Sequence, residues 1–143
     1  MTTGNTRERV FQQLLAREAG TDADARIIAA AARRLCERFA KYLSPVIGDA
    51  GIAAICARSL YLTQQQFPSV APLRSSEDDA PFTRVQASLE RQEPVVATKA
   101  AVAVLTTAGE LLASFIGESL TTRLLREAWP DDFDSDPSKE TTS

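Results

Sequence analysis

The 143-residue sequence contains no histidine, and this absence is its most informative compositional feature. Without an imidazole the chain has no phosphorelay histidine, no His-ligated haem, no HExxH zinc site, no Ser-His-Asp or Cys-His nucleophile and no histidine pH switch. No phosphate-binding loop replaces these sites, because residues 48–51 lack the strand context and the Gly-Lys-Ser/Thr ending of that motif. We therefore expect a protein without enzymatic activity and without a cofactor or bound metal.

Cysteine is nearly as scarce, with Cys36 and Cys56 as the two examples and no CxxC motif. Both lie in apolar helical patterns, which predicts buried reduced thiols in a cytosolic protein; a disulfide between neighbouring helices is the alternative. The polar start of the sequence, with Arg7 and Glu8, is unlike a signal peptide. The longest apolar stretch, residues 100–105, is too short to cross a bilayer. We expect a cytoplasmic protein with no membrane span.

The remaining composition is that of a soluble globular domain, with 44% hydrophobic and 24% charged residues. Its abundance of alanine and arginine is typical of a bacterial genome rich in G and C. A formal net charge of −3 argues against nucleic-acid binding. The charge is uneven, because residues 7–41 carry a net +3 and residues 127–143 a net −5. A basic helix face and an acidic tail of this kind attract each other, or another copy of the chain.

Apolar residues at helical spacing predict an all-α fold of five to six helices packed in one bundle. A capping box of Asn5 and Glu8 marks the first helix, and Thr21 or Asp22 caps the second. Ser44-Pro45 separates the second helix from the third, because proline disfavours a helical residue before it. The expected helices cover residues 6–19, 22–43, 45–64, 81–92 and 94–128.

One domain is expected over residues 1–130, with a flexible loop at 69–80 and a disordered acidic tail at 131–143. The segment from Val95 to Ile116 is apolar on almost every side, so it must be central in the core or be buried by another subunit. A narrow polar strip interrupts it, and this strip contains Lys99, Thr106 and Glu110. The strip predicts a solvated or ion-paired Glu110; a buried functional carboxylate is the alternative.

An internal repeat relates residues 42–49 to residues 111–118 at an offset of 69. It predicts a duplicated helical hairpin with pseudo-two-fold symmetry, whose halves cover roughly 22–66 and 81–129. Each copy contains Ile-Gly followed by an acidic residue, a pattern suited to a helix–helix corner. The isoleucine packs in the core and the glycine lets the backbone bend. The predicted structural corners are Ile47, Gly48, Ile116 and Gly117.

These features favour a regulatory or adaptor protein that acts through helix-mediated protein–protein interaction as a homodimer. The basic side of the second helix is either a solvated face or an interaction surface for an acidic partner, formed by Arg26, Arg33, Arg34 and Lys41. The alternative function is a sensor or carrier of a small apolar ligand or lipid, in a cavity beside the central helix. That cavity, or a subunit interface, is expected to be lined by Ala97, Ala101, Val104, Leu105, Ala108 and Leu112.

Overall fold

A computed structural model describes residues 3–70 and 81–130 of the chain. Within these ranges the protein consists of five α-helices and one 3₁₀ turn, with no strand, which confirms the predicted all-α bundle. The elements are α1 (Thr3–Ala19), α2 (Ala25–Gln66), η1 (Pro68–Val70), α3 (Pro81–Glu90), α4 (Pro94–Ile116) and α5 (Glu118–Ala128). The predicted tail, 131–143, and most of the predicted loop, residues 71–80, lie outside the described residues.

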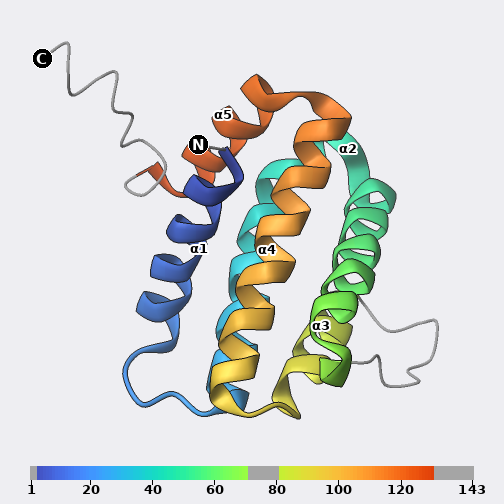
Figure 1. Cartoon of the computed structure of the whole chain (residues 1–143). Helices are drawn as coiled ribbons and strands as arrows, with labels where there is room; N and C mark the ends of the chain where they lie inside the picture. The colour runs from blue at the N-terminus through green and yellow to red at the C-terminus, as the bar shows by residue number, and fades with distance from the viewer. Residues whose placement is uncertain (1–2, 71–80, 131–143) are drawn as a thin grey trace, which may run out of the picture.

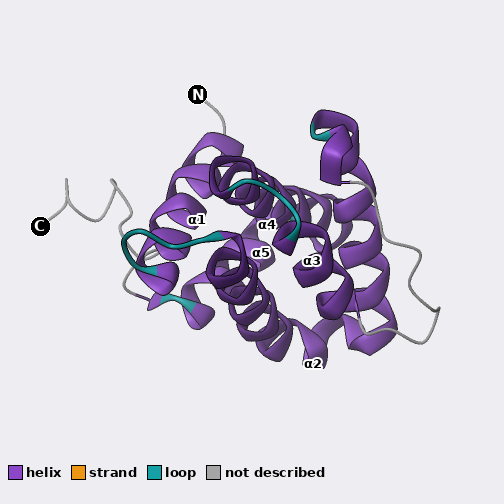
Figure 2. Ribbon diagram, turned by 90° about the horizontal axis from the view of Figure 1, so that it is seen from below, coloured by secondary structure: helices purple, strands orange, loops and turns teal. Residues whose placement is uncertain are grey.

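The bundle is organised around α4, which packs against α1 and α2 (Figure 1). The long helix α2 rises along α4, bends sharply at one end of the bundle and returns beside α3. Figure 2 looks along the bundle and shows only helices joined by short loops in the described part of the chain. This arrangement places the most apolar helix where its neighbours cover it.

The start of α2 differs from the sequence prediction in its capping residue. The side chain of Asp24 accepts a hydrogen bond from the backbone N–H of Ile27 at 2.9 Å and so caps the helix, whereas Thr21 and Asp22 precede it. Asp22 has a positive φ of 56° and belongs to the turn. The first helix likewise begins at Thr3, so that Asn5 lies within it rather than at its cap. Several acceptors near a helix start compete, and packing decides between them.

The predicted boundary at Ser44-Pro45 is wrong, because Pro45 lies within α2 and the helix breaks at Gly48 instead. Proline removes one backbone hydrogen bond, which bends a helix without ending it. Gly48 has φ 76° and ψ 168°, a conformation that essentially only glycine adopts. The chain direction therefore reverses at the glycine, three residues after the proline.

The predicted helix 94–128 is also two helices, since α4 ends at Ile116 and α5 begins at Glu118. The intervening Gly117 has φ 97° and ψ 155°, close to the conformation of Gly48. Its N–H donates to the carbonyl of Ala113 at 2.9 Å, which closes the last turn of α4. Glu118 then occupies the first turn of α5, where the helix dipole favours a negative charge.

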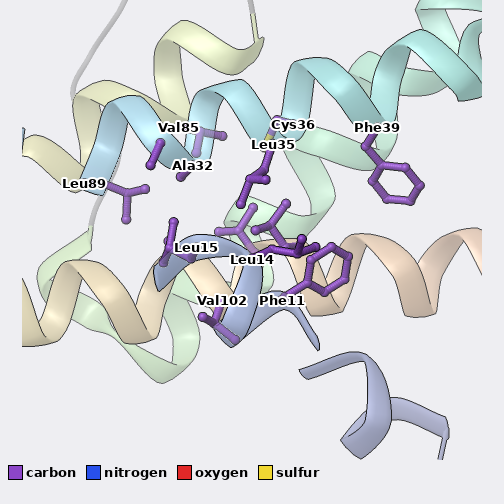
Figure 3. Packing of buried hydrophobic residues seen from close by; sticks show 14 of the residues in the cluster. Phe11, Leu14, Leu15, Ala32, Leu35, Cys36, Phe39, Val85, Leu89 and Val102 are labelled. Atoms are coloured by element: carbon purple, nitrogen blue, oxygen red, sulfur yellow. The ribbon is translucent and has the colours of Figure 1, made fainter. Parts of the chain in front are cut away.

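All five helices contribute to the hydrophobic core, and Figure 3 shows part of it from α1, α2, α3 and α4. Phe11 and Leu15 of α1 and Leu89 of α3 are fully buried against α4 and α2. Alanines and medium-sized side chains make α4 narrow enough for close helix packing. Its buried residues are Ala97, Ala100, Ala101, Val102, Val104, Leu105, Gly109 and Leu112.

Candidate functional site

A surface groove of about 620 Å³ opens between α1, the first half of α2 and the end of α5. Leu14, Leu35 and Trp129 form its apolar floor, and Pro130 lies at its edge. Four cationic side chains and two carboxylates line it. We call this site the basic groove, and its charged residues are Arg17, Glu18, Arg34, Glu37, Arg38 and Lys41.

Hydrogen bonds orient two of the cations in the basic groove. Arg34 donates from Nε to the Glu18 carboxylate at 2.6 Å, which joins α2 to α1. Arg38 donates from Nε to the backbone carbonyl of Ala128 at 2.5 Å, which joins α2 to the end of α5. Within residues 3–70 and 81–130 no carboxylate pairs with the exposed Lys41, whose Nζ lies 6.0 Å from the ring centroid of Tyr42. The groove therefore keeps a positive character.

The four residues of the predicted interaction surface do not all lie together in the structure. Arg34 and Lys41 line the basic groove, but Arg33 is directed toward α3, where it donates to Gln86 at 3.0 Å. Arg33 also pairs with Glu37, at 3.2 Å. Arg26 is exposed near the start of α2 and is not part of the groove lining.

Two groove cations, Arg17 and Arg38, were missed by the sequence interpretation. The spacing of Arg34, Arg38 and Lys41 along α2 places them on one helix face, and this signal was present in the sequence. Arg17 belongs to α1 and joins the groove because α1 packs against α2, which only the tertiary structure shows.

A small apolar cavity lies between the two halves of α2, α3 and α4. Of the predicted lining residues, Val104, Leu105 and Ala108 face it. The other three, Ala97, Ala101 and Leu112, are buried in helix packing and do not line it. Its volume of about 30 Å³ is the space of roughly one water molecule, far below the roughly 300–1,000 Å³ typical of ligand pockets. A cavity of this size is too small for a ligand of ordinary size.

Cys36 and Cys56 both line this cavity, from opposite halves of α2, and both are free thiols. Burial raises the pKa of Cys36 far above its usual value, and the charges of Cys56 and Glu37 add to the effect. Burial also raises the pKa of Cys56 to about 11, although nearby Arg84 opposes the shift. Both thiols are therefore protonated near neutral pH and are poor nucleophiles.

We expect both thiols to react slowly with Ellman's reagent in the native protein at pH 8 and rapidly after unfolding in guanidinium. Because the folded-state pKa of Cys56 is raised from 9.0 to about 11, the unfolded chain loses its proton first as the pH rises. The contribution of this thiol to stability is fully present below pH 9.0 and is lost toward pH 11. Stopped-flow absorbance measures the reaction. Rapid native labelling of either thiol would contradict the buried, protonated state.

The two glycine corners carry matching exposed side chains and lie at the same end of the bundle (Figure 1). Val46 is 44% exposed two residues before Gly48, and Phe115 is 72% exposed two residues before Gly117. Ile47 and Ile116 are partly buried against the core. We call Val46, Ile47, Phe115 and Ile116 the corner residues. The common origin of the two halves stays a prediction.

An ion pair between a buried arginine and an exposed glutamate joins the start of α1 to the second corner. Arg7 is buried and its guanidinium pairs with the carboxylate of Glu118, which follows Gly117. The Arg7 side chain passes over Gly109 of α4, where an added Cβ would lie 3.3 Å from the Arg7 Cδ. Glycine at this position therefore leaves room for the arginine. The pairing was missed because nothing in the sequence relates residues 111 positions apart.

The polar strip of α4 does not contain a buried carboxylate, because Glu110 is exposed, as is Lys99. In the part of the chain that the structure describes, no group of three His, Cys, Asp or Glu side chains is placed to hold a metal ion. Two helices, α2 and α4, are long and apolar enough to cross a membrane by length and composition. The most apolar window of α4 is 44% buried and that of α2 is 28% buried. A core helix meets the same criterion, so this is weak evidence for a membrane location.

The basic groove and the corner residues are two places where the described part of the chain presents specific chemistry at its surface. The groove combines cations with an apolar floor, and the corners present large apolar side chains to solvent. No family model, curated protein or solved structure matches the chain.

Proposed function

We propose that the chain is a non-enzymatic regulatory or adaptor protein that self-associates as a homodimer through the corner residues. The observation that carries this proposal is the 72% exposure of Phe115, together with the 44% exposure of Val46 at the equivalent corner at the same end of the bundle. Exposed large apolar side chains that gather at one place mark interaction surfaces more often than isolated ones do.

A second copy is the partner that best fits this surface. An apolar patch can pack against the same patch of another copy across a two-fold axis, and such isologous dimers are the commonest assemblies. The nearest acid at the second corner, Glu118, is already paired with Arg7, so its charge is compensated within the chain. The second half of α2, which follows the first corner, adds partly exposed apolar residues such as Ile52 and Ile55.

Burial of one phenylalanine side chain stabilises an interface by about 1.5–3 kcal/mol. Since a two-fold contact buries it in both copies, we expect Phe115→Asp to weaken the dimer at least about hundredfold. Size-exclusion chromatography with light scattering measures this change. The wild-type chain should have twice the monomer mass of 15.5 kDa at micromolar concentration, and the variant should have the monomer mass.

The matched control is Val95→Asp, which places the same charge on another exposed apolar residue, 65% exposed, at the other end of α4. This control should leave the dimer intact, and circular dichroism should show unchanged helix content in both variants. A monomeric wild-type chain at about 10 μM would overturn the proposal, as would a Phe115→Asp variant that stays dimeric.

A further inference from the structure

We propose that the acidic segment 131–143 of the chain binds in the basic groove of the same molecule. The groove has cationic side chains around an apolar floor, and the described part of the chain ends at its edge with Pro130. The occupant is therefore argued from charge complementarity and from the position at which the segment leaves the fold.

The charges of the segment complement those of the groove. Residues 131–136 contain four aspartates and no cation, with one aromatic residue, Phe133, among them. The groove presents four cations against two carboxylates. Its apolar floor, which includes Leu14 and Leu35, suits an aromatic side chain as well as aspartate methylenes. An acidic peptide with an aromatic residue is thus the ligand chemistry that the groove favours.

The fold fixes the point from which the segment starts. Trp129 is 6% exposed and packs between Phe11 and Phe39, so the end of α5 is held in the core. Arg38 donates to the carbonyl of Ala128, one residue before this tryptophan. The acidic segment therefore starts directly after Pro130, which itself lines the basic groove together with Arg38.

The dimensions allow the aspartates to reach the cations. Arg34 and Lys41 are seven positions apart on α2, and at 1.5 Å per residue this rim is about 10 Å long. Six extended residues span roughly 20 Å, so residues 131–136 are long enough to follow the rim in either direction. Lys41 has no carboxylate partner in ranges 3–70 and 81–130 and is the first cation that we expect them to engage.

Occupation by its own acidic segment would make the groove a regulated surface. Any external acidic peptide would have to displace residues 131–143, which are held at high effective concentration by their covalent link. The contact is partly exposed and depends on charge, so salt should weaken it.

The test uses the full chain with a nitroxide spin label attached to Ser135→Cys, since the buried, protonated Cys36 and Cys56 label slowly. The nitroxide broadens the NMR signals of nearby groups. At low salt the backbone amide resonances of Arg34, Arg38 and Lys41 should therefore lose most of their intensity. A variant with asparagine in place of Asp131, Asp132, Asp134 and Asp136 gives the baseline for an unbound segment tethered at Pro130. In that variant, and with Lys41→Glu, these signals should be clearly more intense than in the chain with its four aspartates and Lys41.

Two control variants change charges at positions outside the basic groove and outside the acidic segment. Glu77→Gln, Asp78→Asn and Asp79→Asn together remove three acids elsewhere, and Lys99→Glu reverses an exposed charge on α4. Neither control should restore the signals. Intensities equal to those of the asparagine variant would overturn the proposal. A mixture of isotope-labelled chains without nitroxide and unlabelled chains with nitroxide tests whether the bound segment belongs to the same molecule or to a second copy. Signal loss in this mixture would show that the segment of a second copy occupies the groove. That result would overturn binding within one molecule.

Discussion

Replacing Trp129 with alanine is expected to lower the free energy of unfolding by about 3–5 kcal/mol. The indole is almost fully buried and lies edge-on to Phe11, with ring centroids 5.9 Å apart, and 6.0 Å from the ring of Phe39. These contacts join α5 to α1 and α2, so alanine would leave a cavity where three helices meet. Loss of the edge-to-face aromatic pair adds to the cost.

Guanidinium unfolding followed by far-ultraviolet circular dichroism measures this change, because the variant lacks the tryptophan that fluorescence would require. Tyr61→Ala is the matched control, since Tyr61 is an exposed aromatic residue in the second half of α2. It should shift the free energy of unfolding by less than about 1 kcal/mol. A Trp129→Ala variant that unfolds as the wild type does would contradict the position of this side chain in the core.

Valine in place of Gly48 or Gly117 should destabilise the fold by about 1–3 kcal/mol at each corner. Both glycines have positive φ with ψ near the extended range, a region strongly unfavourable for a side chain with a β-carbon. An added Cβ would meet no atom within 4 Å at either position, so the cost is backbone strain and not overpacking. Alanine should therefore destabilise nearly as much as valine.

Thermal and chemical unfolding of the four single variants measure these costs. Ala54→Val is the control, because Ala54 is exposed in the second half of α2 and valine there costs only its lower helix propensity, about 0.5 kcal/mol. Unchanged melting temperatures for the variants at both glycines would show that a side chain at these positions causes no backbone strain.

The fold class was predictable because it depends on periodicity, which is local. The continuous apolar surface of residues 95–116 indicated a central helix, and α4 is that helix. The Ile-Gly-acid pattern indicated a change of direction, and both Gly48 and Gly117 have non-helical backbone angles. The exact helix boundaries were less predictable. In the sequence, Pro45 indicates the end of a helix, but in the structure α2 continues through Pro45.

The candidate site depended much more on tertiary structure. Arg33 and Arg34 are neighbours in the sequence, yet one is directed toward Gln86 of α3 and the other toward Glu18 of α1. Successive helical residues differ by about 100° in direction, so each meets whichever helix packs on that side. Trp129 likewise has the sequence context of a helix end, but the packing of α5 buries it beneath α1 and α2.

By itself, the sequence determined that the chain is helical, that one helix is central and that glycines mark two corners, because propensity, periodicity and backbone freedom act over a few residues. Only the tertiary structure decided that Arg17 joins Arg34, Arg38 and Lys41 around one groove, that Arg7 passes over Gly109 to Glu118, and that Phe115 stays exposed. These contacts join residues far apart in the chain, and their geometry follows from how whole helices pack.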